Sequence, residues 1–139
     1  MSQTVLITGA SNGIGKASAR VFARKGYDLV LVARHREKLE AVKAELSEYD
    51  VHIKVVAMDL TGEDAAVDLY NNLVLDDISI DILVNNAGFG DHGAFHDSSW
   101  EKQKKMVLLN IMALMQMTYV FGQSMKRRKK GRILNVASI

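Results

Sequence analysis

Cysteine and proline are both absent from this chain of 139 residues. Without cysteine there is no disulfide framework, no thiol catalysis and no thiolate metal site, and this composition fits a reducing compartment. At an average usage of about 5%, a chain of this length would hold roughly seven prolines. The lack of proline indicates regular elements joined by Gly, Asn and Asp turns, or a piece of a longer protein whose prolines lie elsewhere.

A large excess of charge and a long apolar run are absent too. Basic and acidic residues number 18 and 16, which gives a net charge of +2, and this balance does not by itself predict a polyanionic partner. The apolar stretches are interrupted well before the ~20 residues of a membrane helix, and the N-terminus lacks the basic start and cleavage site of a signal peptide. We therefore expect a soluble, cytoplasmic protein with no membrane or nucleic-acid partner.

Short apolar runs alternate along the chain with segments of helical periodicity. The runs lie at residues 4–8, 29–33, 53–58, 80–85 and 133–137. They show no polar alternation, which is typical of strands buried on both faces, and the helical segments between them are mostly ten residues or longer. This order predicts right-handed crossovers and a parallel sheet covered by helices on both faces. We therefore expect an α/β, doubly wound Rossmann-type fold.

Two hydroxyl residues have the spacing of helix caps. Thr61 with Asp64 resembles a capping box before the third helix, and Ser98 with Glu101 suggests a cap for a long helix that reaches about Met125. We expect a helix to begin directly after each of these hydroxyl residues.

A glycine-rich turn, Thr8-Gly9-Ala10-Ser11-Asn12-Gly13-Ile14-Gly15, lies between the first predicted strand and the first helix. A phosphate site there needs a sharp turn at Gly9, close backbone approach at Gly13 and tight helix–strand packing at Gly15. The spacing is G-x-x-x-G-x-G, not the G-x-G-x-x-G of the dinucleotide fingerprint, but the strand–turn–helix context is satisfied. A plain glycine-rich turn is the alternative, and it would be favoured if the glycines stood alone.

With this spacing the sequence resembles the short-chain dehydrogenase/reductase family, whose cofactor loop is written T-G-x-x-x-G-x-G. Asn85-Asn86-Ala87-Gly88 is similar to the family's N-N-A-G motif, and Asp59 falls where the family places an aspartate against the adenine ring. The resemblance implies a dinucleotide-binding (Rossmann) domain over residues 1–139. It also implies that the following residues bind the cofactor: Gly9, Ser11, Asn12, Gly13, Ile14, Gly15, Asp59, Leu60, Asn86, Ala87 and Gly88.

The residues after the second strand bear on the choice of cofactor. Arg34 lies 19 positions beyond Gly15 and is followed by His35 and Arg36, with no carboxylate at that spot. An acidic residue there binds the ribose hydroxyl of NAD, whereas an arginine accommodates the 2′-phosphate of NADP. Arg34 and Arg36 therefore favour NADP(H) over NAD(H). The alternative is that both merely solvate the start of a helix, although a cation at a helix N-terminus is mildly unfavourable unless an anion is bound.

The resemblance implies hydride transfer between the nicotinamide and a carbonyl or secondary alcohol. Ser138 would hydrogen-bond the substrate oxygen, Asn110 would position a water in the proton relay, and a Tyr-x-x-x-Lys pair would act as acid or base. No tyrosine of this chain has a lysine four residues later, and the chain ends one residue after Ser138. We expect a C-terminally incomplete domain that lacks its last strands and is inactive alone. The alternative is a noncatalytic nucleotide-binding or assembly fragment.

Three other features have simpler explanations than new chemistry. The cluster 126–130 is a possible nucleic-acid patch, but cations also complement a helix C-terminus. His92 and His96 have the spacing of a metal pair, yet Gly93 and the loop context argue against it, so no metal site is expected. The long helix predicted up to Met125 is rich in methionine and suggests core packing plus a subunit interface; its methionines are Met106, Met112, Met115, Met117 and Met125. With the apolar edge at 133–139, it predicts a homo-oligomer or aggregation.

Overall fold

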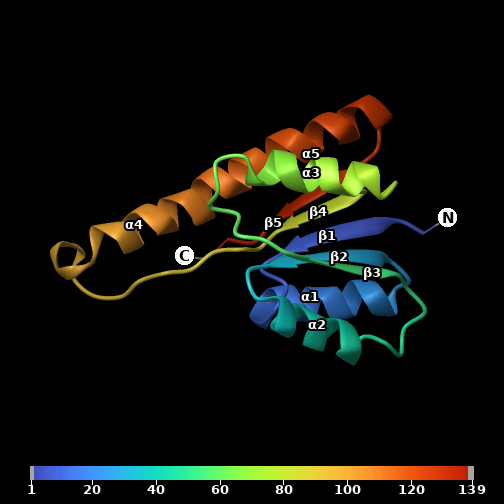
Figure 1. The fold of residues 1–139 in the computed structure, drawn as a ribbon, viewed down its shortest axis with the longest axis horizontal. Coiled ribbons are helices and arrows are strands. Elements are labelled where there is room, and N and C mark those ends of the chain that lie inside the picture. The colour runs from blue at the N-terminus through green and yellow to red at the C-terminus, as the bar shows by residue number, and fades with distance from the viewer. Residues whose placement is uncertain (1, 138–139) are drawn as a thin grey trace.

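The computed structural model describes residues 2–137, and its central element is a five-stranded parallel sheet (Figure 1). The strand order is β3-β2-β1-β4-β5. Because the chain steps outward from β1 in both directions, the sheet has a topological switch point between β1 and β4, at whose carboxyl edge ligands bind. The strands are β1 (Thr4–Thr8), β2 (Asp28–Ala33), β3 (Ile53–Ala57), β4 (Ile82–Asn85) and β5 (Arg132–Asn135).

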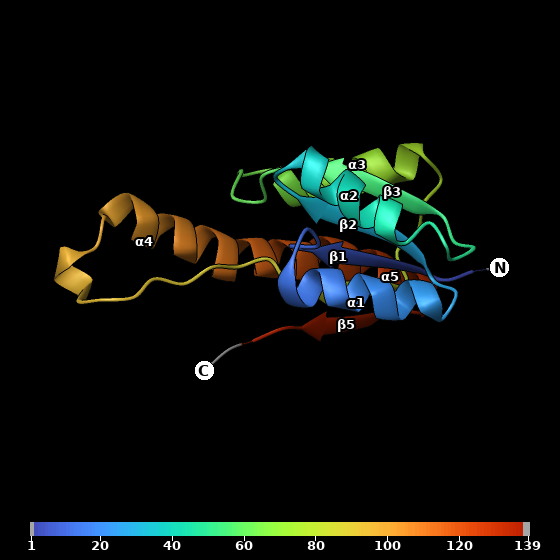
Figure 2. The same cartoon turned by 90° about the horizontal axis from the view of Figure 1, so that it is seen from below.

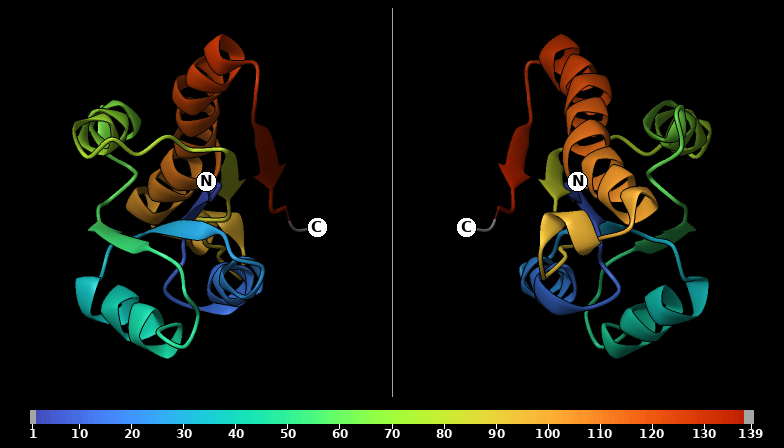
Figure 3. Two further views of the ribbon diagram at one scale, coloured as in Figure 1. Left: turned by 90° about the vertical axis from the view of Figure 1, so that its right-hand side faces the viewer. Right: turned by 90° about the vertical axis from the view of Figure 1, so that its left-hand side faces the viewer.

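Helices cover both faces of the sheet, as the sequence predicted. Helices α1 (Gly13–Arg24) and α2 (Arg36–Glu45) lie on one face, and α3 (Ala65–Leu75) and α5 (Leu114–Arg128) lie on the other (Figures 1 and 3). The fold is therefore the expected doubly wound Rossmann-type α/β arrangement.

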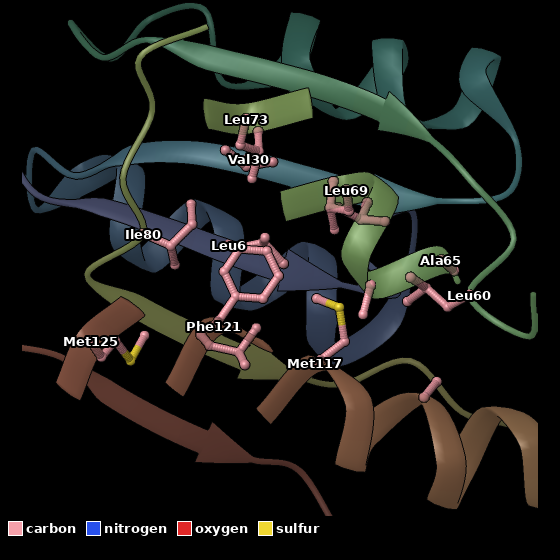
Figure 4. Packing of buried hydrophobic residues seen from close by; sticks show 14 residues of the cluster. Leu6, Val30, Leu60, Ala65, Leu69, Leu73, Ile80, Met117, Phe121 and Met125 are labelled. Carbon is pink, nitrogen blue, oxygen red and sulfur yellow. The ribbon is translucent and has the colours of Figure 1, made fainter. Parts of the chain in front are cut away.

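Alternation along the strands divides the core into two layers. Leu6 packs under α3 and α5, whereas its neighbours Val5 and Ile7 pack against α1 and α2, and all three are fully buried. Figure 4 shows Leu6 beside Phe121 and near Met117, which come from α5. Burying a side chain of this size contributes roughly 1.5–3 kcal/mol, so both faces of β1 stabilise the sheet on which the site is built.

A single helical run of 29 residues extends from Trp100 to Arg128. It consists of α4 (Trp100–Val107), a π-helical segment (Leu108–Ala113) and α5. The carboxyl half packs on the sheet, and α4 extends beyond it (Figure 2). By length and composition this run could cross a membrane, with 17% of its most apolar stretch buried. The expectation that every apolar stretch is interrupted well before membrane length was therefore wrong for this run, because its charged residues lie only near its two ends. Core helices of soluble proteins meet the same criterion.

Both predicted helix caps are displaced by hydrogen bonds to nearby aspartates. Ser99, not Ser98, caps α4: the Ser99 Oγ accepts the Lys102 N–H at 3.4 Å, while the Ser98 hydroxyl donates to Asp91 Oδ2 at 2.7 Å. Thr61 forms no capping box either, since its hydroxyl donates to Asp59 Oδ1 at 2.7 Å and α3 begins only at Ala65. Each hydroxyl donates to a carboxylate, and this charge-assisted hydrogen bond holds its oxygen away from the helix N–H groups that it would accept as a cap.

The basic cluster 126–130 lies at the C-terminal end of α5. Arg128 and Lys130 place nitrogen atoms 3.2 and 3.6 Å from Asp81 Oδ1, and the Arg127 guanidinium donates to the Tyr70 hydroxyl. These contacts support the interpretation of the basic cluster as the cationic end of a helix. Nucleic-acid binding by this cluster stays untested.

Strand β5 forms one edge of the sheet and pairs with β4 alone among the described residues. Ile133 and Leu134 on β5 are 38% and 51% exposed. The helical run adds further exposed apolar side chains, namely Val107, Ile111, Met112, Met115 and Tyr119. The predicted apolar edge is therefore present as far as residue 137, and the homo-oligomer it suggests stays a prediction.

Candidate cofactor-binding cleft

A cleft of about 300 Å³ opens at the carboxyl edge of the sheet, beside the switch point. It is lined by the segments that follow β1, β2, β3 and β4 and by one face of the long helix. These residues are Gly9, Ser11, Asn12, Val32, Ala33, Arg34, His35, Lys38, Met58, Asp59, Leu60, Thr61, Ala87, Gly88, Phe89, Lys105 and Leu109.

A larger hollow of about 580 Å³ lies at the opposite, amino-terminal edge of the strands, lined by Thr4, Asp28, His52 and Asp81 among others. None of the predicted site residues lines it. Ligands of open α/β sheets bind outside the carboxyl ends of the strands, so position and chemistry both favour the smaller cleft.

The glycine turn after β1 has the backbone conformation that the sequence predicted. Gly9 and Gly13 have positive φ values of +63° and +54°, which favour glycine. The first backbone hydrogen bond of α1 is donated by the Lys16 N–H to the Asn12 carbonyl oxygen at 3.1 Å. The N–H groups of Gly13, Ile14 and Gly15 therefore have no acceptor within the helix. These donors and the helix dipole suit an anion, and no atom lies within 4 Å of where a Gly13 Cβ would stand.

Gly15 is required by packing rather than by a torsion angle. A Cβ at Gly15 would collide with the Gly9 carbonyl oxygen and would stand 2.6 Å from the Asn86 Nδ2. The first turn of α1 can therefore approach β1 this closely only with glycine at position 15, as predicted.

Thr8 and Asn86 join the glycine turn to the loop after β4. The Thr8 Oγ1 accepts the backbone N–H groups of Asn86 and Ala87, both at 2.9 Å. The Asn86 side-chain amide donates to the carbonyl oxygens of Thr8 and Gly9, both at 3.2 Å. Asn86 therefore supports the turn and does not line the cleft. Sequence reasoning assigned no role to Thr8, although a threonine at the end of an apolar strand was a signal for a specific hydrogen bond. Thr8 is only 2% exposed.

Asp59 is held in its ionised form at the end of β3. Its Oδ1 accepts the Thr61 backbone N–H at 3.0 Å and the Thr61 hydroxyl at 2.7 Å. These two bonds lower the pKa of the Asp59 carboxyl, and the positive charges of Arg34 and Lys105 lower it further, while burial opposes them. No hydrogen bond to Oδ2 occurs in the described part of the chain, so this oxygen is available to a donor in the cleft.

Cations surround Asp59, but they differ partly from those predicted. Arg34 lines the cleft as expected, whereas Arg36 does not, and its guanidinium lies 3.9 Å from the Glu40 carboxylate on the exposed surface of α2. Lys38 and Lys105 line the cleft and were missed. The start of α2 could have indicated Lys38, but nothing in the sequence connects Lys105 to the strand ends.

Asn110 lies in the π-helical segment, a kind of structure often found at functional sites. Its Nδ2 donates to the Phe89 carbonyl oxygen at 2.8 Å and its Oδ1 accepts the Phe89 N–H at 3.1 Å. This side chain therefore fixes the loop after β4. A Cβ on Gly88 would stand 2.9 Å from the Asn110 Oδ1, so glycine lets the loop approach. The role of Asn110 in a water relay stays a prediction, and Ser138 lies outside the described residues.

The loop that contains His92 and His96 is ordered by a carboxylate. Asp91 accepts hydrogen bonds from the Ser98 hydroxyl and the Lys102 ammonium, both at 2.7 Å, and these lower its pKa to about 2. His96 Nε2 lies 3.7 Å from Asp97 Oδ1 at the surface. Within residues 2–137 no three His, Asp or Glu side chains gather as a metal site would require.

Comparison with known proteins agrees with this geometry. The sequence is 37% identical to the very-long-chain 3-oxoacyl-CoA reductase of Phaeosphaeria nodorum, over 96% of this chain and 40% of that protein. It is also 37% identical to the 17-beta-hydroxysteroid dehydrogenase type 3 of Mus musculus, over 99% of this chain and 46% of that protein. This chain therefore spans less than half the length of these relatives.

Solved structures of short-chain dehydrogenases are also similar to this chain. A metagenomic short-chain oxidoreductase in complex with NADP superposes with a TM-score of 0.94 at 33% identity, covering 100% of this chain and 64% of that one. A short-chain dehydrogenase from Sphingobium yanoikuyae in complex with NADPH gives 0.90 at 38% identity, covering 99% and 54%. The sequence model of the short chain dehydrogenases matches residues 3–139. With its glycine turn, its N-N-A-G loop and this match along nearly its whole length, the chain belongs to the short chain dehydrogenase family.

Proposed function

We propose that the cleft binds NADP(H) and that the protein containing this sequence transfers hydride between this cofactor and a carbonyl or secondary alcohol. The observation that carries the cofactor choice is the charge of the lining. Arg34 and Lys38 line the cleft, and the lining contains a single carboxylate, Asp59, which already accepts two hydrogen bonds from Thr61. An added phosphate gains charge-assisted hydrogen bonds in this environment.

The residues of the cleft fit the parts of a dinucleotide. The unpaired N–H groups at the start of α1 and the open space at Gly13 suit the pyrophosphate. Arg34 and Lys38 suit a 2′-phosphate, and Asp59 with Leu60 suits the adenine. When bound, the nicotinamide would donate or accept the hydride. Similar proteins solved with NADP and NADPH support this assignment.

The substrate is proposed only as a class. One relative is named a reductase of a 3-oxoacyl thioester and another a dehydrogenase of a hydroxysteroid. Those names share a ketone or a secondary alcohol as the reacting group. We propose that class for the protein that contains this sequence.

A second function is favoured by one sequence observation. The tyrosines at 27, 49, 70 and 119 all lack a lysine four residues later. The acid–base pair that the resemblance implies is thus not found within these residues. We propose that the 139-residue chain by itself binds NADP(H) without turnover, as a nucleotide-binding module.

Two measurements on the purified 139-residue protein test these proposals. Titration with NADPH, followed by nicotinamide fluorescence, should give saturable binding. Addition of a ketone should leave the NADPH absorbance at 340 nm unchanged. The absence of saturable binding would refute the cofactor proposal, whereas steady oxidation of NADPH would refute binding without turnover.

A further inference from the structure

Lys105 reaches the cofactor cleft from α4, whereas the other lysine and the arginine of the cleft come from the segment after β2. We propose that Lys105 is a further cofactor-binding residue, which recognises the adenine ring together with Asp59 by donating a hydrogen bond to a ring nitrogen. This inference rests on the proposed binding of NADP(H). It gives helix α4 a part in recognition of the base.

The direction of Lys105 is set by its helix. Lys105 lies one helical turn before Leu109, so the two side chains share a face of the helix. Leu109 is partly buried against the core cluster that contains Leu60, and it lines the cleft with Lys105. Packing of Leu109 therefore orients this face, and Lys105 with it, toward the end of β3.

Neighbouring lysines on α4 differ from Lys105 in what they contact. The Lys102 ammonium lies 2.7 Å from Asp91 Oδ1 and anchors the preceding loop, and Lys104 does not line the cleft. Among residues 2–137, none of the ion pairs within 4.0 Å involves Lys105. Its ammonium group is therefore free to donate to a ligand.

Asp59 and Lys105 form a complementary pair for one kind of base. Asp59 offers a carboxylate acceptor, since its Oδ1 holds Thr61 and its Oδ2 has no partner among the described residues. Lys105 offers a donor in the lining of the same cleft. Adenine presents an exocyclic amino donor flanked by ring-nitrogen acceptors, whereas guanine presents a carbonyl acceptor at that position. Asp59 therefore suits the adenine amino group and would repel the guanine carbonyl at that position, while Lys105 suits the ring nitrogen beside it.

Binding measurements with Lys105→Met test this assignment, and Lys104→Met is the matched control on the same helix. Loss of a charge-assisted hydrogen bond at an exposed site corresponds to about a tenfold loss of affinity. Lys105→Met should therefore weaken NADPH and NADH alike by about tenfold, and Lys104→Met should change neither. Equal unfolding midpoints for the two variants would establish that the fold is retained.

Deaza analogues of NADPH identify the contact itself. Replacing the contacted ring nitrogen by CH, in either the 1-deaza or the 7-deaza analogue, should weaken binding to the wild type about tenfold and should have no effect in Lys105→Met. Analogue penalties that persist in Lys105→Met, a loss confined to NADPH, or unchanged NADPH affinity would each overturn the inference. If the wild type binds no dinucleotide at all, the proposed function itself fails.

Discussion

The side-chain amide of Asn86 donates a hydrogen bond to the carbonyl oxygen of Gly9 at 3.2 Å. This bond connects the loop after β4 with the glycine turn after β1, and Gly15 packs directly against both partners. The N-N-A-G loop therefore supports the glycine turn through hydrogen bonds, and the two segments form one structural unit.

Replacing Asn86 tests this connection. Asn86→Leu removes both donated bonds and leaves two carbonyl oxygens without a partner, so the free energy of unfolding should fall by about 1–3 kcal/mol. Urea denaturation measures the change, with Asn71→Leu on the exposed surface of α3 as the control. A stability equal to that of the control would contradict the supporting role of Asn86.

The packing of Gly15 leads to a second prediction. Gly15→Ala would force the first turn of α1 away from β1, and overpacking of this kind costs typically 1–3 kcal/mol. NADPH affinity should fall as well, because the N–H groups of that turn would move. Gly90→Ala is the control, since no atom lies within 4 Å of a Cβ at Gly90. If both variants unfold at the same urea concentration, the close contact at Gly15 is not tight.

Lys38 and Arg36 should differ in their effect on NADPH. Lys38 lines the cleft, whereas Arg36 pairs with Glu40. Lys38→Ala should weaken NADPH about fivefold or more and leave NADH nearly unchanged, because only NADPH has the 2′-phosphate. Arg36→Ala should preserve the ratio of the two affinities. Isothermal titration with both cofactors makes the comparison, and the reverse order of effects would restore Arg36 to the site.

The loop at Asp91 should respond to acid in a defined range. Hydrogen bonds from Lys102 and Ser98 lower the pKa of Asp91 from an ordinary 3.8 to about 2. Because the carboxylate form is favoured by folding, its contribution to stability is complete above about pH 3.8 and is lost as the pH falls through about 2. An NMR titration of the Asp91 carboxyl carbon measures the pKa directly. Lys102→Met should raise it, Lys104→Met should not, and a pKa near 3.8 in the wild type would show that the bonds do not form.

The strands and the glycine turn could be predicted because their signals are local. A β-branched apolar run such as residues 4–8 predicts a buried strand wherever it lies, and glycines with positive φ have few substitutes. The fold class and the position of the cleft follow from these elements and from their order along the chain.

The side chains that were missed depend on contacts between distant segments. Ser98 and Thr61 were predicted as caps from spacing alone. In the structure their hydroxyl groups donate hydrogen bonds to Asp91 and Asp59. Lys105 could not be predicted, because only the folded chain brings α4 beside the end of β3.

The ratio of NADPH to NADH affinity, measured by titration of the wild type and of Arg34→Asp, tests the central claim most directly. The wild type should bind NADPH about tenfold or more tightly than NADH, since Arg34 can pair with the 2′-phosphate. Arg34→Asp should abolish or reverse this preference, because a carboxylate repels the phosphate and accepts the ribose hydroxyl instead. Equal affinities of the wild type for both cofactors, or an equal loss of both in Arg34→Asp, would contradict the assignment.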